Sequence, residues 1–425
     1  MKHNAVAALV LAMLFASLRA QYDSVTVIQC GPDTVVSQFG PSSSPRPEFW
    51  NPVDNCVYLT TDWDGVFVLD CDNDSVVGQF DFFFERPYAL DTLDNKLYAA
   101  REGWPQWEFT SVDLGLRTVR VLFTSPQFFT DVGWSPRLNR LYCSGWNDTA
   151  GIWVFDCASD SELGRIHLHP VRFGLNLSND KMCCAGLSTI YLYDLAGDSL
   201  LDTIWAPSLG MVEPWWNPVD GNFYLWDYDK VWVIDGRGDT LIDTVRVSRG
   251  GPICHDMRDN TLYVRTQFGD TVLAFDCATL SVRARIPGVD VDLAVYDSVD
   301  NRIYAISDFS YDHKLTVIDC ASNTIIRQIR LPTISSWGLC WNALMNRIYT
   351  GGNSWMHAVA GERGRPATGG RQRMSSVMRG LPPGAIAFDA TGRRVLNPKP
   401  GIYFVRERSA VGGGRSAVHK VVLTR

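Results

Sequence analysis

Apolar and polar residues alternate along most of the chain, in short runs that turn residues separate. Residues 315–329, for example, read LTVIDCASNTIIRQI, in which two alternating runs meet at Ala-Ser-Asn. Similar stretches occur at 25–39 (VTVIQCGPDTVVSQF) and at 66–80 (VFVLDCDNDSVVGQF). A period of two with many Val and Ile residues, broken by Asx and Gly turns, is typical of β-hairpins. The pattern therefore predicts an all-β chain that repeats one hairpin many times.

A second pattern sets the length of the repeat. The motif Asn-x-apolar-Tyr recurs with variations, and successive copies begin 39 to 45 residues apart, at positions 55, 95, 139, 180, 221, 260, 301 and 346. A segment such as FWNPVD or WWNPVD precedes each copy, and a run such as VFVLD or VWVID follows the first seven. Four short strands in about 40 residues is the repeat length of β-propeller blades.

The number of repeats predicts how the ring closes. Residues 25–39 have the pattern of the third and fourth strands of a blade, and residues 338–351 have that of the first two. We therefore expect an eight-bladed propeller in which the N-terminal strands complete the last blade and remove the exposed sheet edges. A seven-bladed ring with one displaced unit is the alternative, because the unit around Met182 matches the pattern poorly.

Residues that recur at the period are interpreted first as structural. The tyrosines of the second strand are expected to pack between blades: Tyr58, Tyr98, Tyr142, Tyr224, Tyr263, Tyr304 and Tyr349. The aspartates that end the third strand are expected to accept N–H bonds in the following turn: Asp70, Asp113, Asp156, Asp194, Asp235, Asp276 and Asp319.

Four regions are predicted along the chain. Residues 1–20 place Lys2 before an apolar run and read as a secretory signal peptide. Residues 21–355 form the propeller, residues 356–383 are a Gly- and Arg-rich linker, and residues 384–425 form a small C-terminal β module. No later stretch is apolar for long enough to span a bilayer. We therefore expect a protein that is secreted or held on the outer cell surface.

Two parts of the sequence resemble known families. Alternating runs such as LYVRT, VYLTT and VWVID, over about 25–351, look like the YVTN-type β-propeller repeats of exported surface proteins. The C-terminus resembles the sorting domain of type IX secretion cargo through Asp389, Gly392, Arg393 and Val395, then Pro400, Gly401 and Tyr403, and a closing basic-apolar strand at 420–425. The resemblance implies that secretion machinery recognises this module and that the module is then removed. An unrelated small β module is the alternative.

The distribution of charge and of cysteines limits which partners and metals the protein is expected to bind. Residues 361–425 contain 13 Lys or Arg and 3 Asp or Glu, so they carry +10, and residues 21–360 carry −19. Such an acidic propeller argues against nucleic acid as a partner, because phosphate contacts need clustered Lys and Arg. The 11 cysteines form no zinc-binding motif, and no cofactor or metal is predicted. If the turn is 62–65, Cys56 lies opposite Cys71, which makes these two a candidate disulfide.

The function predicted is binding without catalysis. No Gly-x-Ser-x-Gly, His-Glu-x-x-His or phosphate-loop motif is present, so no catalytic residue is assigned and the chain is not expected to be an enzyme. The loops after the second and fourth strands vary in length and are rich in aromatic residues, as recognition loops on a regular scaffold usually are. The candidate ligand-binding residues for a glycan or protein are Trp63, Trp104, Trp107, Trp146, Tyr228 and Tyr311, and the fourth-to-first loops add Phe82, Phe83, Phe84, Phe128 and Phe129. The alternative is a secreted propeller enzyme, such as a lyase, a lactonase or a quinoprotein-like oxidoreductase.

Overall fold

The computed structural model describes most of residues 24–353 and five short C-terminal segments. The described ranges are 24–39, 45–61, 64–101, 106–145, 151–168, 172–207, 209–210, 212–227, 229–266, 270–307, 314–331, 335–353, 375–378, 386–388, 394–395, 401–407 and 417–423. This part of the chain contains no helix with the length and hydropathy that a membrane span would need.

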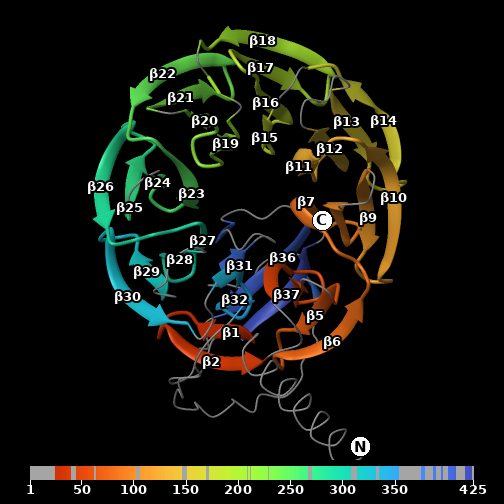
Figure 1. The fold of residues 1–425 in the computed structure, drawn as a ribbon, viewed down its shortest axis with the longest axis vertical. Helices are drawn as coiled ribbons and strands as arrows, with labels where there is room; N and C mark the ends of the chain where they lie inside the picture. The colour runs from red at the N-terminus through yellow and green to blue at the C-terminus, as the bar shows by residue number, and fades with distance from the viewer. Residues whose placement is uncertain are drawn as a thin grey trace, which may run out of the picture.

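Eight antiparallel four-stranded sheets form a ring of blades (Figure 1). Blade 1 contains β3 (Arg46–Asn51), β4 (Cys56–Thr60), β5 (Val66–Asp70) and β6 (Ser75–Phe80), and blade 2 contains β7 (Glu85–Asp91), β8 (Lys96–Arg101), β9 (Trp107–Asp113) and β10 (Thr118–Ser125). Blade 3 contains β11 (Phe129–Ser135), β12 (Arg140–Gly145), β13 (Ile152–Asp156) and β14 (Ser161–Ile166), and blade 4 contains β15 (Arg172–Asn176), β16 (Lys181–Ala185), β17 (Thr189–Asp194) and β18 (Ser199–Trp205). Blade 5 contains β19 (Pro214–Trp216), β20 (Phe223–Trp226), β21 (Lys230–Asp235) and β22 (Thr240–Arg246), and blade 6 contains β23 (Gly250–Asp256), β24 (Thr261–Thr266), β25 (Thr271–Asp276) and β26 (Ser281–Pro287). Blade 7 contains β27 (Leu293–Asp297), β28 (Arg302–Ile306), β29 (Lys314–Asp319) and β30 (Thr324–Arg330), and blade 8 contains β31 (Ser335–Asn342), β32 (Arg347–Asn353), β1 (Ser24–Gln29) and β2 (Thr34–Phe39).

Blade 8 closes the ring as the repeat count predicts. Its strand order is β2-β1-β32-β31, so the N-terminal hairpin supplies the third and fourth strands. The pairing of β1 with β32 is regular from Ser24↔Gly352 to Gln29↔Arg347. The predicted eight-bladed ring is therefore confirmed and the seven-bladed alternative is wrong. Figure 1 shows β2 on the ring's outer edge beside β30 and β6.

The core lies between neighbouring blades. All seven repeat tyrosines are at most 1% exposed, as predicted for residues that pack between sheets. Between blades 1 and 2, for example, Phe49, Tyr58 and Val68 pack against Leu97 and Val112. The second and third strands, such as β4 and β5, are buried along almost their whole length, so both faces of the sheet are apolar there and each is covered by a neighbouring blade.

The turns explain two recurring residues of the sequence. The first residue of the Asn-x-apolar-Tyr motif has φ from 49° to 58° in seven blades: Asn55, Asn95, Asn139, Asp180, Asn260, Asn301 and Asn346. Asn and Asp adopt this left-handed conformation at a lower cost than other non-Gly residues, and Gly221 takes the position in the eighth. Each third-strand aspartate accepts a backbone N–H from its turn, as expected, for instance from Asp72 to Asp70 at 2.8 Å.

The third and fourth strands of every blade pair with a register shift. In blade 1 the shift lies between Val68 and Leu69, and six other blades have it at the equivalent place. In blade 2 the shift lies two residues away, between Val121 and Phe123. Such bulges increase the local twist of the outermost strand.

The C-terminal segments form a separate sheet of five strands, in the order β33-β37-β36-β34-β35. They are β33 (Ser375–Met378), β34 (Ile386–Phe388), β35 (Arg394–Val395), β36 (Gly401–Glu407) and β37 (Ala417–Leu423). Four of them, β34 to β37, fall within residues 384–425, which the sequence predicts to form a small β module.

Candidate functional site

The antiparallel strand order gives the ring two unlike faces. The turns from first to second strand and from third to fourth strand lie on one side, which we call the turn face. The loops from second to third strand and from fourth strand to the next blade lie on the other side, which we call the loop face. Any ligand that binds along the ring axis meets one of these two faces.

On the turn face, side chains of one blade bind the third-to-fourth turn of the next blade. In blade 2 the Nζ of Lys96 donates to Asp160 Oδ1 at 2.9 Å and to the carbonyl of Cys157 at 2.7 Å. The hydroxyl of Tyr98 donates to the same Asp160 oxygen at 2.8 Å. This combination of a basic residue and a tyrosine fixes the angle between neighbouring blades, and we call it the latch.

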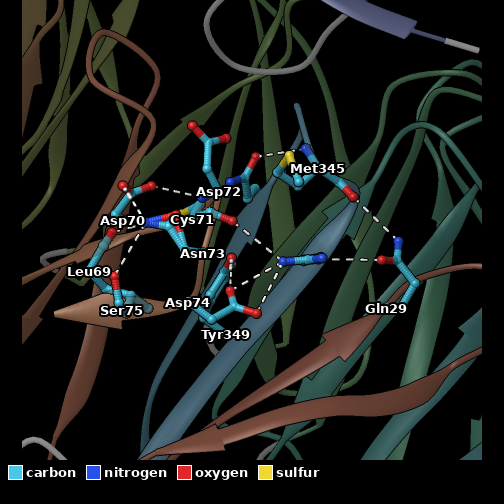
Figure 2. A network of polar contacts seen from close by, with 12 residues as sticks. Gln29, Leu69, Asp70, Cys71, Asp72, Asn73, Asp74, Ser75, Met345 and Tyr349 are labelled. Carbon is cyan, nitrogen blue, oxygen red and sulfur yellow. Dashed lines mark hydrogen bonds and ion pairs between the residues drawn. The ribbon is translucent and has the colours of Figure 1, made fainter. Parts of the chain in front are cut away.

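The latch recurs around the ring with variations. Arg347 and Tyr349 of blade 8 reach Asp74 of blade 1, and Figure 2 shows this network around Asp74 and Tyr349. Equivalent bonds join Lys181 to Asp239, Arg302 and Tyr304 to Asp33, Tyr263 to Asn323, and Arg140 to the carbonyl of Leu195. The sequence interpretation assigned the tyrosines to packing but missed the basic residues. Their signal in the sequence is the Lys or Arg two residues before the repeat tyrosine, at 96, 140, 302 and 347, and before Cys183 at 181.

A second set of bonds joins the first-to-second turns. The residue that ends the first strand is Asn in several blades, and its amide reaches the Asn of the next blade's turn. Asn51 donates to Asn95 at 2.8 Å, Asn217 to Asn260 at 2.6 Å, and Asn342 to Asn55 at 3.1 Å. The described polar groups of the turn face are thus largely used to hold the ring together.

Most of the predicted ligand-binding residues lie outside the described residues. These are Trp63, Trp104, Trp146, Tyr228 and Tyr311, and they stay predictions. Trp107 is described: it begins β9 on the loop face and is half-buried. Its ring meets that of Phe128 at 6.5 Å between centroids with an interplanar angle of 60°. Phe128 is 43% exposed, so this contact forms an aromatic surface that spans blades 2 and 3.

Other aromatic residues of the loops are buried and pack in the core. Phe82, Phe84 and Phe129 are 1%, 6% and 3% exposed, so the expectation that they are bare on the loop face is wrong. Phe82 and Phe84 stack on each other, and Phe84 meets Tyr88 edge to face, which closes the end of the interface between blades 1 and 2. Phe83 and Phe128 remain exposed.

An ion-pair cluster lies where three first strands meet the loop face. Arg172 at the start of β15 binds both carboxylate oxygens of Asp131 on β11 through Nε, at 3.0 and 3.1 Å. Its Nη2 donates to Glu213, next to β19, at 2.9 Å. Burial raises the pKa of the Asp131 carboxyl to about 6, although the charge of Arg172 opposes the shift. The sequence interpretation did not find this cluster, because its three members fall in different blades without a shared motif.

The cysteine expectation is wrong in its register. Cys56 pairs with Asp70, and Cys71 lies one residue beyond the end of β5. Both thiols are free and buried in the structure. Burial raises the pKa of Cys71 to about 12, so this thiol stays protonated near neutral pH.

Metal ligands are not gathered in the described ranges: no three His, Cys, Asp or Glu side chains there are close enough together to hold an ion.

Comparisons with known proteins give the fold. No protein-family model matches the chain, and no curated protein matches it. Many chains of solved structures do match. One, titled dihydro-heme d1 dehydrogenase NirN in complex with DHE, has a TM-score of 0.56 and 14% identity over 72% of this chain and 73% of that chain. Another, titled mitotic checkpoint complex, has a TM-score of 0.48 and 14% identity over 61% and 85%. At this identity the first likeness supports the propeller fold and carries no statement about activity.

Proposed function

We propose that this protein is an exported binding module whose loop face recognises a glycan or a protein. The observation that carries this proposal is the difference between the two faces. On the turn face, many of the described polar side chains are engaged between blades through the latches and the Asn bonds. On the loop face, the half-buried Trp107 and the exposed Phe128 form an aromatic surface.

Aromatic rings are suited to this role because they offer a large, rigid contact area. When a sugar or an apolar side chain covers an exposed ring, the ring leaves water and loses little side-chain entropy. The Asp131–Arg172–Glu213 cluster lies on the same face and supplies both hydrogen-bond donors and acceptors for a polar ligand group. Variable loops on a regular ring are also the usual place for recognition.

Export completes the proposal. The apolar N-terminal segment directs the chain to the secretory route, and the C-terminal module is the signal read by secretion machinery. The mature propeller would then act outside the cell or on its surface. This part rests on the sequence motifs of residues 1–20 and 384–425.

A secreted propeller enzyme is the second candidate, and one observation favours it. Asp131 has a pKa of about 6 beside Arg172 and Glu213, and a carboxyl that titrates near neutral pH is suited to general acid-base catalysis. Asp131→Asn should abolish turnover if this cluster is catalytic, whereas it should leave ligand binding by the aromatic surface detectable.

The experiment is a glycan and peptide array probed with the full chain. We expect at least one class of ligand to bind, and we expect Trp107→Ala and Phe128→Ala to weaken it at least about tenfold, the loss of roughly 1.4 kcal/mol. Trp205→Ala is the matched control, because Trp205 is 70% exposed but lies at the end of β18, on the ring's outermost strand. Equal losses in all three variants would contradict the Trp107–Phe128 surface as the binding site, and losses only in turn-face variants would contradict the choice of face.

A further inference from the structure

The residue that ends the first strand differs between blades in a way that affects the joints between them. Where it is Asn, its amide donates to the next blade, as Asn342 does to Asn55. In three blades it is an aspartate, namely Asp91, Asp256 and Asp297, each 0% exposed. An ionised carboxylate accepts hydrogen bonds and cannot donate them, so it cannot make this bond.

The aspartates are therefore only half-satisfied. In Asp297 one oxygen, Oδ1, accepts the N–H groups of Val299 at 2.8 Å and of Asp300 at 3.1 Å. The other oxygen, Oδ2, is buried and accepts no hydrogen bond from a nitrogen or oxygen donor within the described part of the chain, and the donor beside this carboxylate is the weakly donating thiol of Cys30. A buried polar atom without a partner is costly, and more so when it carries charge.

Asp297 stands at the joint where the N-terminal hairpin closes the ring, between blades 7 and 8. The hairpin's turn carries Cys30, whose thiol lies near Asp297 and has a raised pKa because of burial and the charge of Asp297. The same turn carries Asp33, which binds Tyr304 at 2.6 Å and Arg302 at 2.8 Å. That arginine is thus paired with Asp33.

The charged groups around Asp297 do not favour its ionised form. Asp300 of its own turn is a carboxylate, and it accepts a bond from Asn346 of blade 8 at 2.7 Å. Cys30 and Tyr304 are neutral, and burial raises the pKa of both. The Cys30 thiol opposes the shift of Asp297 through a weak hydrogen bond, which is smaller than the effect of burial. Arg327 of β30 donates to the carbonyl of Pro32. Burial, with the charge of Asp300 adding to it, raises the pKa of Asp297 to about 7.

We propose that the joint between blades 7 and 8 is proton-dependent: it is tight when Asp297 is protonated and loosens when Asp297 ionises. The protonated carboxyl has an O–H that can donate towards blade 8, as the amide of Asn342 donates towards blade 1. Above neutral pH the buried charge has only the weak thiol donor of Cys30 beside it, so opening of the joint around Asp297 is favoured. The latch of Arg302 and Tyr304 on Asp33 still ties the turn of the β1–β2 hairpin to blade 7, so the opening is local. This inference is independent of the ligand proposed for the loop face.

The raised pKa of Asp297 determines how the stability of the joint changes with pH. Because the pKa of Asp297 is raised from 3.8 to about 7 in the folded protein, its protonated form stabilises the closed joint at low pH. That contribution falls as pH rises from about 4 and is gone above about 7, after which stability no longer changes through this group.

Hydrogen exchange of the full chain tests the proposal, with peptides that cover residues 24–39 followed by mass spectrometry between pH 5.5 and 8.5. After correction for the intrinsic exchange rate, we expect the protection factors of this hairpin to fall at least about tenfold across the range. The opening equilibrium changes about tenfold for each pH unit that lies between the pKa values of Asp297 in the open and closed joint. Asp297→Asn should give a flat profile, because asparagine carries the donor at every pH.

Two further variants keep the test decisive. Asp91→Asn changes the joint between blades 2 and 3 and should leave the profile of the N-terminal hairpin as in the wild type. Asn342→Asp should create a new pH dependence at the joint between blades 8 and 1, seen in peptides around Asp74. A wild-type profile that is flat, or an Asp297→Asn profile that still falls with pH, would overturn the proposal.

Discussion

The contribution of the latch can be measured by comparing two tyrosines in the same environment. Tyr98 and Tyr142 occupy the same position in blades 2 and 3 and are 0% and 1% exposed. The Tyr98 hydroxyl donates to Asp160 at 2.8 Å, whereas the Tyr142 hydroxyl is buried and makes no hydrogen bond to the described residues. Replacing either residue with phenylalanine removes one oxygen and leaves the ring packing unchanged.

The two substitutions should therefore differ in stability. A hydrogen bond to a charged group contributes about 1.5–3 kcal/mol. Asp160 keeps Lys96 at 2.9 Å and Ser111 at 3.1 Å when Tyr98 is changed, so the carboxylate is not left alone. We expect Tyr98→Phe to lower the free energy of unfolding by about 1.5 kcal/mol, at the lower end of that range. Tyr142→Phe should be neutral or slightly stabilising, because it removes a buried polar atom that lacks a partner.

Urea unfolding of the full chain, followed by tryptophan fluorescence, gives the comparison. Midpoints are compared at equal slope, because a change in slope would signal a change in the unfolded state or in cooperativity. Combining Tyr98→Phe with Asp160→Asn in a double-mutant cycle isolates the pairwise contribution. Equal losses for Tyr98→Phe and Tyr142→Phe would refute the reasoning, since the hydroxyl bond would then contribute nothing beyond packing.

Three other outcomes are expected. Deleting residues 24–39 should lower the thermal midpoint far more than removal of residues 1–20, because it leaves the β32 edge unpaired; scanning calorimetry of the two truncations checks this, and equal midpoints would contradict ring closure as a source of stability. Asp131→Asn should flatten the pH dependence of the thermal midpoint between about pH 4 and 6, because the raised pKa of Asp131 makes the wild type lose stability as pH rises through that interval. A chain without residues 384–425 should stay inside its host cell, and the secreted wild-type protein should lack Arg425 by mass spectrometry; normal secretion of the truncated chain would count against the sorting role.

Much of the fold could be predicted because each blade repeats the same local rules. The Asn at the left-handed turn position and the aspartate that accepts turn N–H groups are visible in the sequence, and together they fix the number of strands per repeat. Closure by residues 25–39 followed from the order of these elements alone.

The candidate site was harder to predict because it depends on neighbours across blades. Phe82 and Phe128 both lie in fourth-to-first loops, yet one is buried against blade 2 and the other is exposed. Asp131 and Arg172 are 41 residues apart in the chain and meet only because adjacent first strands run side by side. The Lys or Arg of the latch recurs at one position of the repeat and can be seen in the sequence. Its partner is a turn in the next blade, and the pattern within one repeat does not reveal this contact.

The repeated register shift in the outer hairpins has a consequence for behaviour at high concentration. The outermost strands carry exposed apolar side chains, including Leu200, Leu201, Leu241 and Ile242, and each has one unpaired edge. A straight apolar edge of this kind would be a template for strand addition between molecules. The bulge twists that edge in all eight blades, so two rings cannot align a long row of backbone groups. We therefore expect the ring to resist strand addition between molecules despite the exposed apolar side chains on its outer strands.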